Sequence, residues 1–103
     1  MIQLKHSVKL LGLQPEIVLA IMVCEKIYAK YNIDMVVTSI TDSKHSTFSR
    51  HYQGFAFDLR TRNIPSDSLQ LKILQEIQKS LTKDFNVIDE GTHFHIGFKP
   101  TYN

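Results

Sequence analysis

Two six-residue segments of the chain alternate apolar and polar side chains, and they restrict the fold more than any other feature. In residues 55–60, the apolar positions Phe55, Phe57 and Leu59 alternate with Ala56, Asp58 and Arg60. In residues 93–98, Phe94, Ile96 and Phe98 alternate with His93, His95 and Gly97. A period of two is typical of a β-strand whose two faces differ in polarity. We therefore expect two strands, each with one face suited to a core and one face of different character.

Two amphipathic helices are predicted in the rest of the chain. The first runs from Pro15 to about Tyr31 and the second from Pro65 and Ser66 to about Lys83. In both, apolar residues recur three or four positions apart, which places them on one side of a helix. The apolar positions are Ile17, Ala20, Ile21, Cys24, Ile27 and Tyr28 in the first helix, and Leu69, Ile73, Ile77 and Leu81 in the second. These faces are expected to pack in the core.

Two further strands are predicted in residues 34–40 and 85–88, which are rich in apolar and β-branched side chains. The polar residues 41–52 are expected to form a loop, and residues 89–91 a turn. The resulting order is helix, strand, strand, helix, strand, strand. It predicts an α+β fold in which a mostly antiparallel sheet has both helices packed on one face.

The length of 103 residues predicts a single domain over residues 1–103, and no oligomeric state is predicted. Twelve Lys and Arg against ten Asp and Glu give a net charge of +2, so a nucleic-acid partner is not expected. The longest apolar stretch, residues 17–24, has eight residues against the ~20 that span a bilayer, so no membrane insertion is expected. The single cysteine, Cys24, is expected to be a buried core thiol.

Three polar residues of the alternating segments should converge on one sheet face. His93 and His95 are two positions apart on one strand, so their Cα atoms lie about 6.5 to 7 Å apart on the same side. If the apolar faces of both strands pack on the helices, Asp58 lies on that side too. His51 precedes Asp58 by seven residues, and Gly54 between them permits a sharp turn. His51, Asp58 and one of the two later histidines form a ligand group suited to zinc.

Each of these residues also has a simpler interpretation. His93 and His95 could be hydrogen-bonded sheet histidines without a metal, and Arg60 could be the partner of Asp58. Isolated histidines in polar segments, such as His6 and His45, are expected to be solvated. Spacing alone leaves both the metal site and these alternatives open.

Two motifs resemble those of a known family. Residues 49–58, SRHYQGFAFD, match all five fixed positions of the pattern SxHxxGxAxD, and residues 93–95, HFH, match HxH. The chain therefore resembles the zinc-dependent D-Ala-D-Ala carboxypeptidase and L-alanyl-D-glutamate endopeptidase family, whose small α+β domain is shared with the signalling domain of hedgehog proteins. Within that group it looks most like short peptidase-like proteins of bacteriophages and bacteria.

The resemblance implies a set of site residues. His51, Asp58 and His95 would be the zinc ligands, and His93 would stabilise the oxyanion of the tetrahedral intermediate. Glu90 would be the base, because Thr92 occupies the position at which relatives often carry an acid. The alternative is that His93 is the third ligand, since Glu90 lies three residues before it.

Substrate-binding residues are also implied by the resemblance. Ser49 would orient the loop or His51 on the substrate side of the site. An arginine that often precedes the first motif in relatives is absent here, and Lys44, His45 or Arg50 would take its place.

The expected function is that of a zinc metallopeptidase acting on D-amino-acid-containing stem peptides of bacterial peptidoglycan, as a D,D-carboxypeptidase or an L-Ala-D-Glu endopeptidase. The alternative is a zinc-stabilised binding module of the same fold without peptidase activity. The N-terminal residues carry no sustained apolar region and no small-residue cleavage site, so synthesis in the cytoplasm is expected. Such a protein could be an endolysin of phage origin, released at lysis or carried in the virion.

Overall fold

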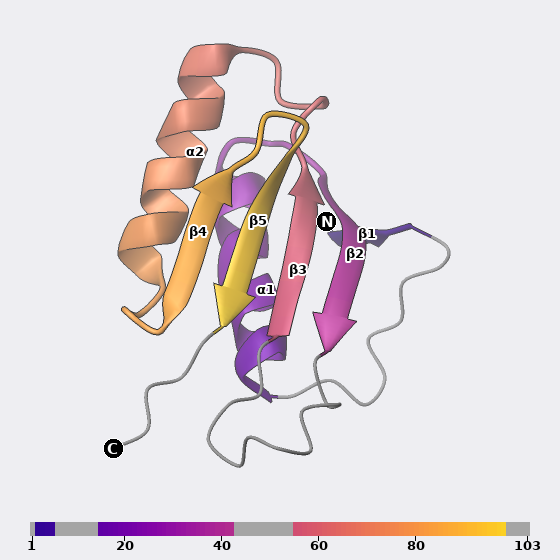
Figure 1. The fold of residues 1–103 in the computed structure, drawn as a ribbon. Coiled ribbons are helices and arrows are strands. Elements are labelled where there is room, and N and C mark those ends of the chain that lie inside the picture. The colour runs from indigo at the N-terminus through magenta and orange to yellow at the C-terminus, as the bar shows by residue number, and fades with distance from the viewer. Residues whose placement is uncertain (1, 6–14, 43–54, 99–103) are drawn as a thin grey trace, which may run out of the picture.

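A computed structural model describes residues 2–5, 15–42 and 55–98 of the chain. Two helices and a five-stranded mixed sheet make up an α+β fold, shown in Figure 1. The elements in chain order are β1 (Ile2–Leu4), α1 (Pro15–Lys30), β2 (Met35–Asp42), β3 (Phe55–Arg60), α2 (Asp67–Ser80), β4 (Phe85–Asp89) and β5 (His93–Phe98). The strands lie side by side in the order β1-β2-β3-β5-β4.

The predicted order of elements is confirmed, with one addition at the N-terminus. Strand β1 pairs in parallel with β2 at the edge of the sheet, whereas β2–β3, β3–β5 and β4–β5 are antiparallel. A strand of three residues is too short to show a period in the sequence. Two predicted boundaries were wrong by a few residues: β2 continues to Asp42, and α2 ends at Ser80.

Local sequence explains where the helices begin and end. Ser66 caps α2, because its hydroxyl accepts a 3.2 Å hydrogen bond from the Leu69 backbone N–H. Helix α1 is followed by Asn32, whose φ of 63° lies in the left-handed region that asparagine tolerates. The Ile33 N–H then bonds back to the Tyr28 carbonyl at 3.1 Å. This turn leads the chain directly into β2.

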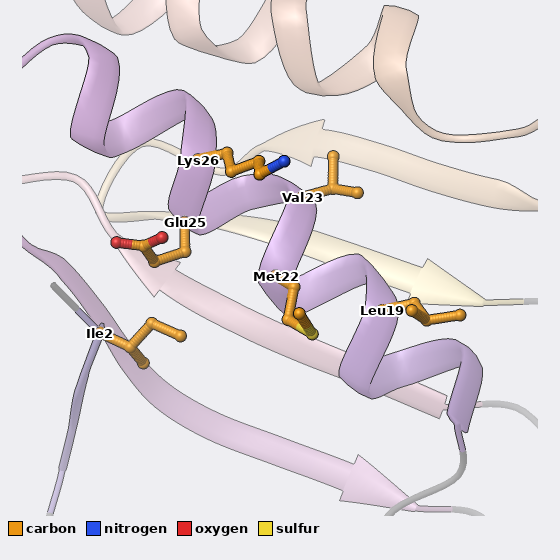
Figure 2. A pocket seen from close by; sticks show the side chains of 6 residues that line it. All are labelled: Ile2, Leu19, Met22, Val23, Glu25 and Lys26. Atoms are coloured by element: carbon orange, nitrogen blue, oxygen red, sulfur yellow. The ribbon is translucent and has the colours of Figure 1, made fainter.

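An apolar hollow of about 410 Å³ lies between β1 and α1. Figure 2 shows Ile2 from the strand and Leu19, Met22 and Val23 from the helix around it. Leu19 and Met22 are 61% and 55% exposed, so this side of α1 is not covered by the described part of the chain. No helix in the described ranges is both long enough and apolar enough to cross a bilayer.

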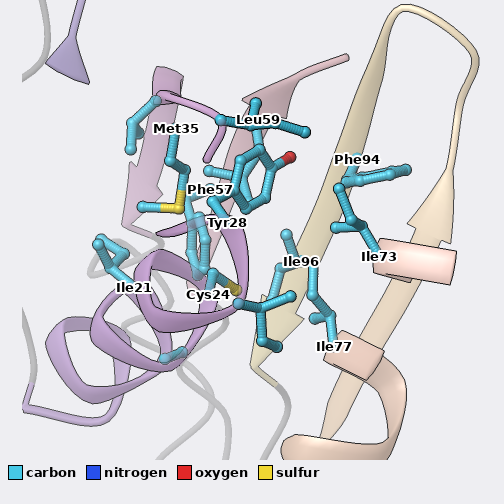
Figure 3. Packing of buried hydrophobic residues seen from close by; sticks show 14 of the residues in the cluster. Ile21, Cys24, Tyr28, Met35, Phe57, Leu59, Ile73, Ile77, Phe94 and Ile96 are labelled. Atoms are coloured by element: carbon cyan, nitrogen blue, oxygen red, sulfur yellow. The ribbon is translucent and has the colours of Figure 1, made fainter. Parts of the chain in front are cut away.

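The hydrophobic core lies between one face of the sheet and the two helices (Figure 3). Its fully buried side chains include Cys24 and Tyr28 of α1, Met35 and Val37 of β2, Phe57 and Leu59 of β3, Ile73 and Ile77 of α2, and Phe94 and Ile96 of β5. The predicted burial of Cys24 is confirmed, and burial raises the pKa of its thiol to about 12. Because Phe57, Leu59, Phe94 and Ile96 all face the helices, the alternate positions of β3 and β5 face away from them.

Candidate functional site

The pairing of β3 with β5 places the predicted site residues opposite one another. In this antiparallel register Asp58 is directly opposite His95, and Arg60 is directly opposite His93. Directly opposed side chains lie on the same face, with Cβ atoms about 4.5 to 5.5 Å apart. The expected convergence of Asp58 and the two histidines on the sheet face away from the helices is therefore observed.

The Asp58 carboxylate is held by a neighbour on each side. Its Oδ1 lies 2.9 Å from His95 Nδ1, and its Oδ2 accepts a 2.8 Å hydrogen bond from the Ser39 hydroxyl on β2. A carboxylate oxygen accepts hydrogen bonds, so His95 Nδ1 is the donor in this contact. The side chains of Asp58 and His95 are 22% and 36% exposed, which leaves this pair accessible to a ligand.

His93 connects Asp58 to the β4–β5 turn. Its Nε2 lies 2.9 Å from Glu90 Oε1 and 3.8 Å from Asp58 Oδ2. Its Nδ1 lies 3.0 Å from the Thr92 hydroxyl. Glu90 is therefore not simply a solvated turn residue, because its carboxylate reaches into the row of polar side chains. In order along this row lie Glu90, His93, Asp58 and His95.

The turn that carries Glu90 is fastened to two other elements. Buried Thr61 follows β3, and its hydroxyl donates a 2.6 Å hydrogen bond to the Gly91 carbonyl, while its N–H bonds to the Thr92 carbonyl at 3.2 Å. Gln70 of α2 donates to both carboxylate oxygens of Asp89 at 3.0 and 3.2 Å. Gly91 has a φ of 89°, a conformation that other residues rarely adopt. The contacts from Thr61 and Gln70 fix the position of the β4–β5 turn relative to the end of β3 and to α2.

Several predicted site residues lie outside the described residues. These are the ligand His51, the substrate-side residues Ser49, Arg50 and Lys44, and His45. Asp58, His93, His95 and Glu90 are described and brought together. Within residues 2–5, 15–42 and 55–98, no group of three or more His, Cys, Asp or Glu side chains is arranged to hold a metal ion. A three-ligand centre at Asp58 and His95 therefore needs a donor from elsewhere in the chain.

Two features of the site were not foreseen from the sequence. Ser39 was not singled out, although a hydroxyl pair, Thr38 and Ser39, interrupts the apolar run of β2 at the point where the β2–β3 register shifts. Arg60 was considered as the partner of Asp58, but that interpretation was wrong. Among the described residues, the partners of the Asp58 carboxylate are Ser39, His95 and, at longer range, His93.

A polar cleft of about 530 Å³ adjoins the row at His93. Its walls come from β2, the end of β3, the start of α2 and the β4–β5 turn, and they include Thr38, Arg60, Arg62, Gln70 and Thr92. The site thus consists of a carboxylate–imidazole row on the sheet and a polar cleft beside it.

Comparisons of the chain with protein-family models, with curated proteins and with solved structures find no match.

Proposed function

We propose that the protein is a zinc-dependent peptidase that hydrolyses D-amino-acid-containing stem peptides of bacterial peptidoglycan. The single observation that carries the proposal is the 2.9 Å contact of Asp58 with His95 on the sheet face away from the helices, next to His93 and Glu90. These four residues belong to the two motifs or to the turn before the second motif. The α+β fold, with helices on the opposite side of the sheet, agrees with the resemblance to the hedgehog and D-Ala-D-Ala peptidase group.

The proposed zinc ligands are His51, Asp58 and His95. Asp58 Oδ1 and His95 Nδ1 are 2.9 Å apart, so both residues would hold the ion once Nδ1 gives up the proton that it donates to the carboxylate. The Ser39 hydroxyl would keep the other carboxylate oxygen in place, as hydrogen bonds to metal-binding carboxylates commonly do. Zinc, when bound, supplies Lewis-acid activation of water and polarisation of a peptide carbonyl.

His93 and Glu90 have separate proposed roles in the reaction. His93, 31% exposed and next to Asp58, would donate a hydrogen bond to the oxyanion that develops on the attacked carbonyl. Glu90 would accept the proton from the attacking water, because its carboxylate already lies on the same side of the sheet. The 2.9 Å contact between Glu90 and His93 would let the carboxylate orient the ring.

The experiment that tests the proposal is digestion of purified muropeptides by zinc-loaded and by chelated protein, followed by mass spectrometry. Loss of a terminal D-alanine would identify a D,D-carboxypeptidase, and cleavage between L-alanine and D-glutamate would identify an endopeptidase. Cleavage should require zinc and should be abolished by Asp58→Ala. Zinc binding without cleavage of any muropeptide would contradict the proposal and would identify a metal-stabilised binding module instead.

The biological setting follows from the same proposal. A stem peptide of peptidoglycan would be the partner. A peptidase made in the cytoplasm would meet its substrate when a phage lyses the cell or when the protein is carried in a virion.

A further inference from the structure

The polar cleft and the carboxylate–imidazole row (Glu90, His93, Asp58 and His95) share one residue, His93. His93 lines the cleft and also contacts Glu90 and Asp58. Arg60 lines the cleft as well, and it is the directly opposed partner of His93 and lies two positions after Asp58 on the same face of β3. A molecule bound at the row and extending past His93 on this side would enter the cleft that Arg60 lines.

The charged groups of this cleft are not balanced. Of the described residues that line it, Arg60 and Arg62 are basic and Asp67 is acidic. Neither guanidinium forms a hydrogen bond or ion pair with any described residue, Asp67 included. Asp67 lies in the first turn of α2, where the helix dipole already favours a negative charge. The cleft thus offers an excess of positive charge that no described side chain neutralises.

The neutral polar side chains of the cleft are already engaged. The Thr38 hydroxyl donates to the Asp58 carbonyl at 3.4 Å, and the Thr92 hydroxyl pairs with His93 Nδ1 at 3.0 Å. Gln70 donates to Asp89 at 3.0 Å. Among the described residues that line the cleft, the donors without such a contact are the planar guanidiniums of Arg60 and Arg62, whose geometry suits a carboxylate bound through two parallel hydrogen bonds.

We infer that Arg60, assisted by Arg62, binds a free carboxylate of the peptide substrate in the cleft beside His93. The inference rests on the proposed peptidase function and gives it a specificity element: substrates with a carboxylate close to the scissile bond are preferred over their amides. It places this recognition at the end of β3, rather than in the part of the chain that holds Lys44 and Arg50. Arg60 is half-buried and Arg62 exposed, so Arg60 is expected to contribute more.

The test compares two small probes that the protein cannot cleave as peptides, acetyl-D-alanine and acetyl-D-alaninamide. Their affinities are measured by NMR titration of the zinc-supplemented full chain, with zinc content determined on the same samples. The wild type should bind the acid at least about tenfold more tightly than the amide, the scale of a charge-assisted hydrogen bond. Arg60→Gln should remove this preference, Arg60→Lys should keep part of it, and Arg62→Gln should reduce it.

Lys79→Gln is the matched control, because it removes one exposed positive charge from the last turn of α2, away from the cleft. It should keep the full preference for the acid. Equal wild-type affinities for acid and amide would overturn the inference, and so would an Arg60→Gln variant that discriminates as well as the wild type. If zinc binds and muropeptides are cleaved while the acid preference is absent, the inference fails and the proposed function stands. If the acid preference is present but neither zinc binding nor cleavage is found, the proposed function fails instead, and the cleft is a carboxylate site of another kind.

Discussion

Asp58 Oδ1 and His95 Nδ1 lie 2.9 Å apart at directly opposed positions of β3 and β5. Both residues are flanked by fully buried neighbours: Phe57 and Leu59 on β3, and Phe94 and Ile96 on β5. A shift of either strand by one residue would expose the two buried side chains of that strand and separate the polar pair. The core therefore fixes the geometry of the candidate site through the strand register.

The first prediction concerns metal content. Purified, zinc-supplemented and dialysed protein is expected to carry about one zinc per chain, because three protein ligands and a water fill a tetrahedral site. Asp58→Ala and His95→Ala should each lose the metal, and chelation should lower the melting temperature of the wild type. Elemental analysis and thermal melts measure both effects. Asp84→Asn, a carboxylate change in the α2–β4 connection, should keep the zinc; a wild type without metal would refute the site.

The second prediction separates the two histidines of β5. His95→Ala should lose most of the zinc, since Nδ1 of this residue is beside Asp58. His93→Ala should keep the zinc but lower turnover by about 100-fold or more, through weaker stabilisation of the transition state. Zinc content and muropeptide turnover are measured on the same preparations. If His93→Ala loses zinc and His95→Ala keeps it, the third ligand is His93.

The sequence predicted the parts of this arrangement that depend on residue periodicity. The alternation in residues 55–60 and 93–98 was enough to place Asp58, His93 and His95 on one face, because the side chains of a strand point to alternate sides. It did not predict that Asp58 pairs with His95 and Arg60 with His93, since the register depends on how both strands pack on α1 and α2.

Contacts between elements that are distant in the sequence could not be predicted from residue periodicity either. The hydrogen bond from Ser39 to Asp58 joins residues 19 positions apart, and the bond from Thr61 to Gly91 joins residues 30 positions apart. The three-residue strand β1 has no readable period, and its parallel pairing with β2 follows from the tertiary fold. Local patterns therefore predicted which side chains share a face, while packing decides which side chains touch.

The third prediction concerns the base. Glu90→Gln should keep the fold and the zinc but lower muropeptide turnover by a factor of about 100 or more, the scale of a lost general base. Glutamine keeps the size of the side chain and a hydrogen-bonding oxygen for His93, so orientation of the ring should survive. Turnover is measured across pH for both proteins. Undiminished turnover would place the base elsewhere, and a gain on Thr92→Asp would show that the natural protein is a weakened peptidase or a binder.

The fourth prediction concerns the Tyr28 hydroxyl. Tyr28 is fully buried, and its hydroxyl has no hydrogen-bond partner among the described residues. Burial also raises the pKa of this hydroxyl. Because an unsatisfied buried hydroxyl carries a desolvation cost, Tyr28→Phe should stabilise the fold by about 1 kcal/mol, or about 4 °C in melting temperature. Tyr31→Phe is the control and should give no gain, since the Tyr31 hydroxyl interacts with Glu76. A destabilised Tyr28→Phe variant would show that the hydroxyl has a partner after all.

The last prediction concerns an ion pair that joins the two helices. Lys30 at the end of α1 donates to Glu76 on α2. This hydrogen bond, together with that from Tyr31, lowers the pKa of the Glu76 carboxyl below its ordinary value of 4.5. A carboxyl whose pKa is lower in the folded state than in the unfolded state stabilises the fold at pH values above the unfolded pKa. That stabilisation is lost as the pH falls through the lower, folded pKa.

The test compares the free energy of unfolding of the wild type, Glu76→Gln and Lys30→Gln at neutral pH and at successively lower pH below 4.5, in chelated protein so that metal release does not contribute. Both variants should be less stable than the wild type at neutral pH, and the difference should shrink as Glu76 becomes protonated. The double variant should be about as stable as either single variant, because both substitutions remove the same contact. Because the Lys30 side chain is 57% exposed, added salt should also reduce the difference. A difference between wild type and Glu76→Gln that stays constant with falling pH would show that the contribution of Glu76 comes from packing and not from its charge.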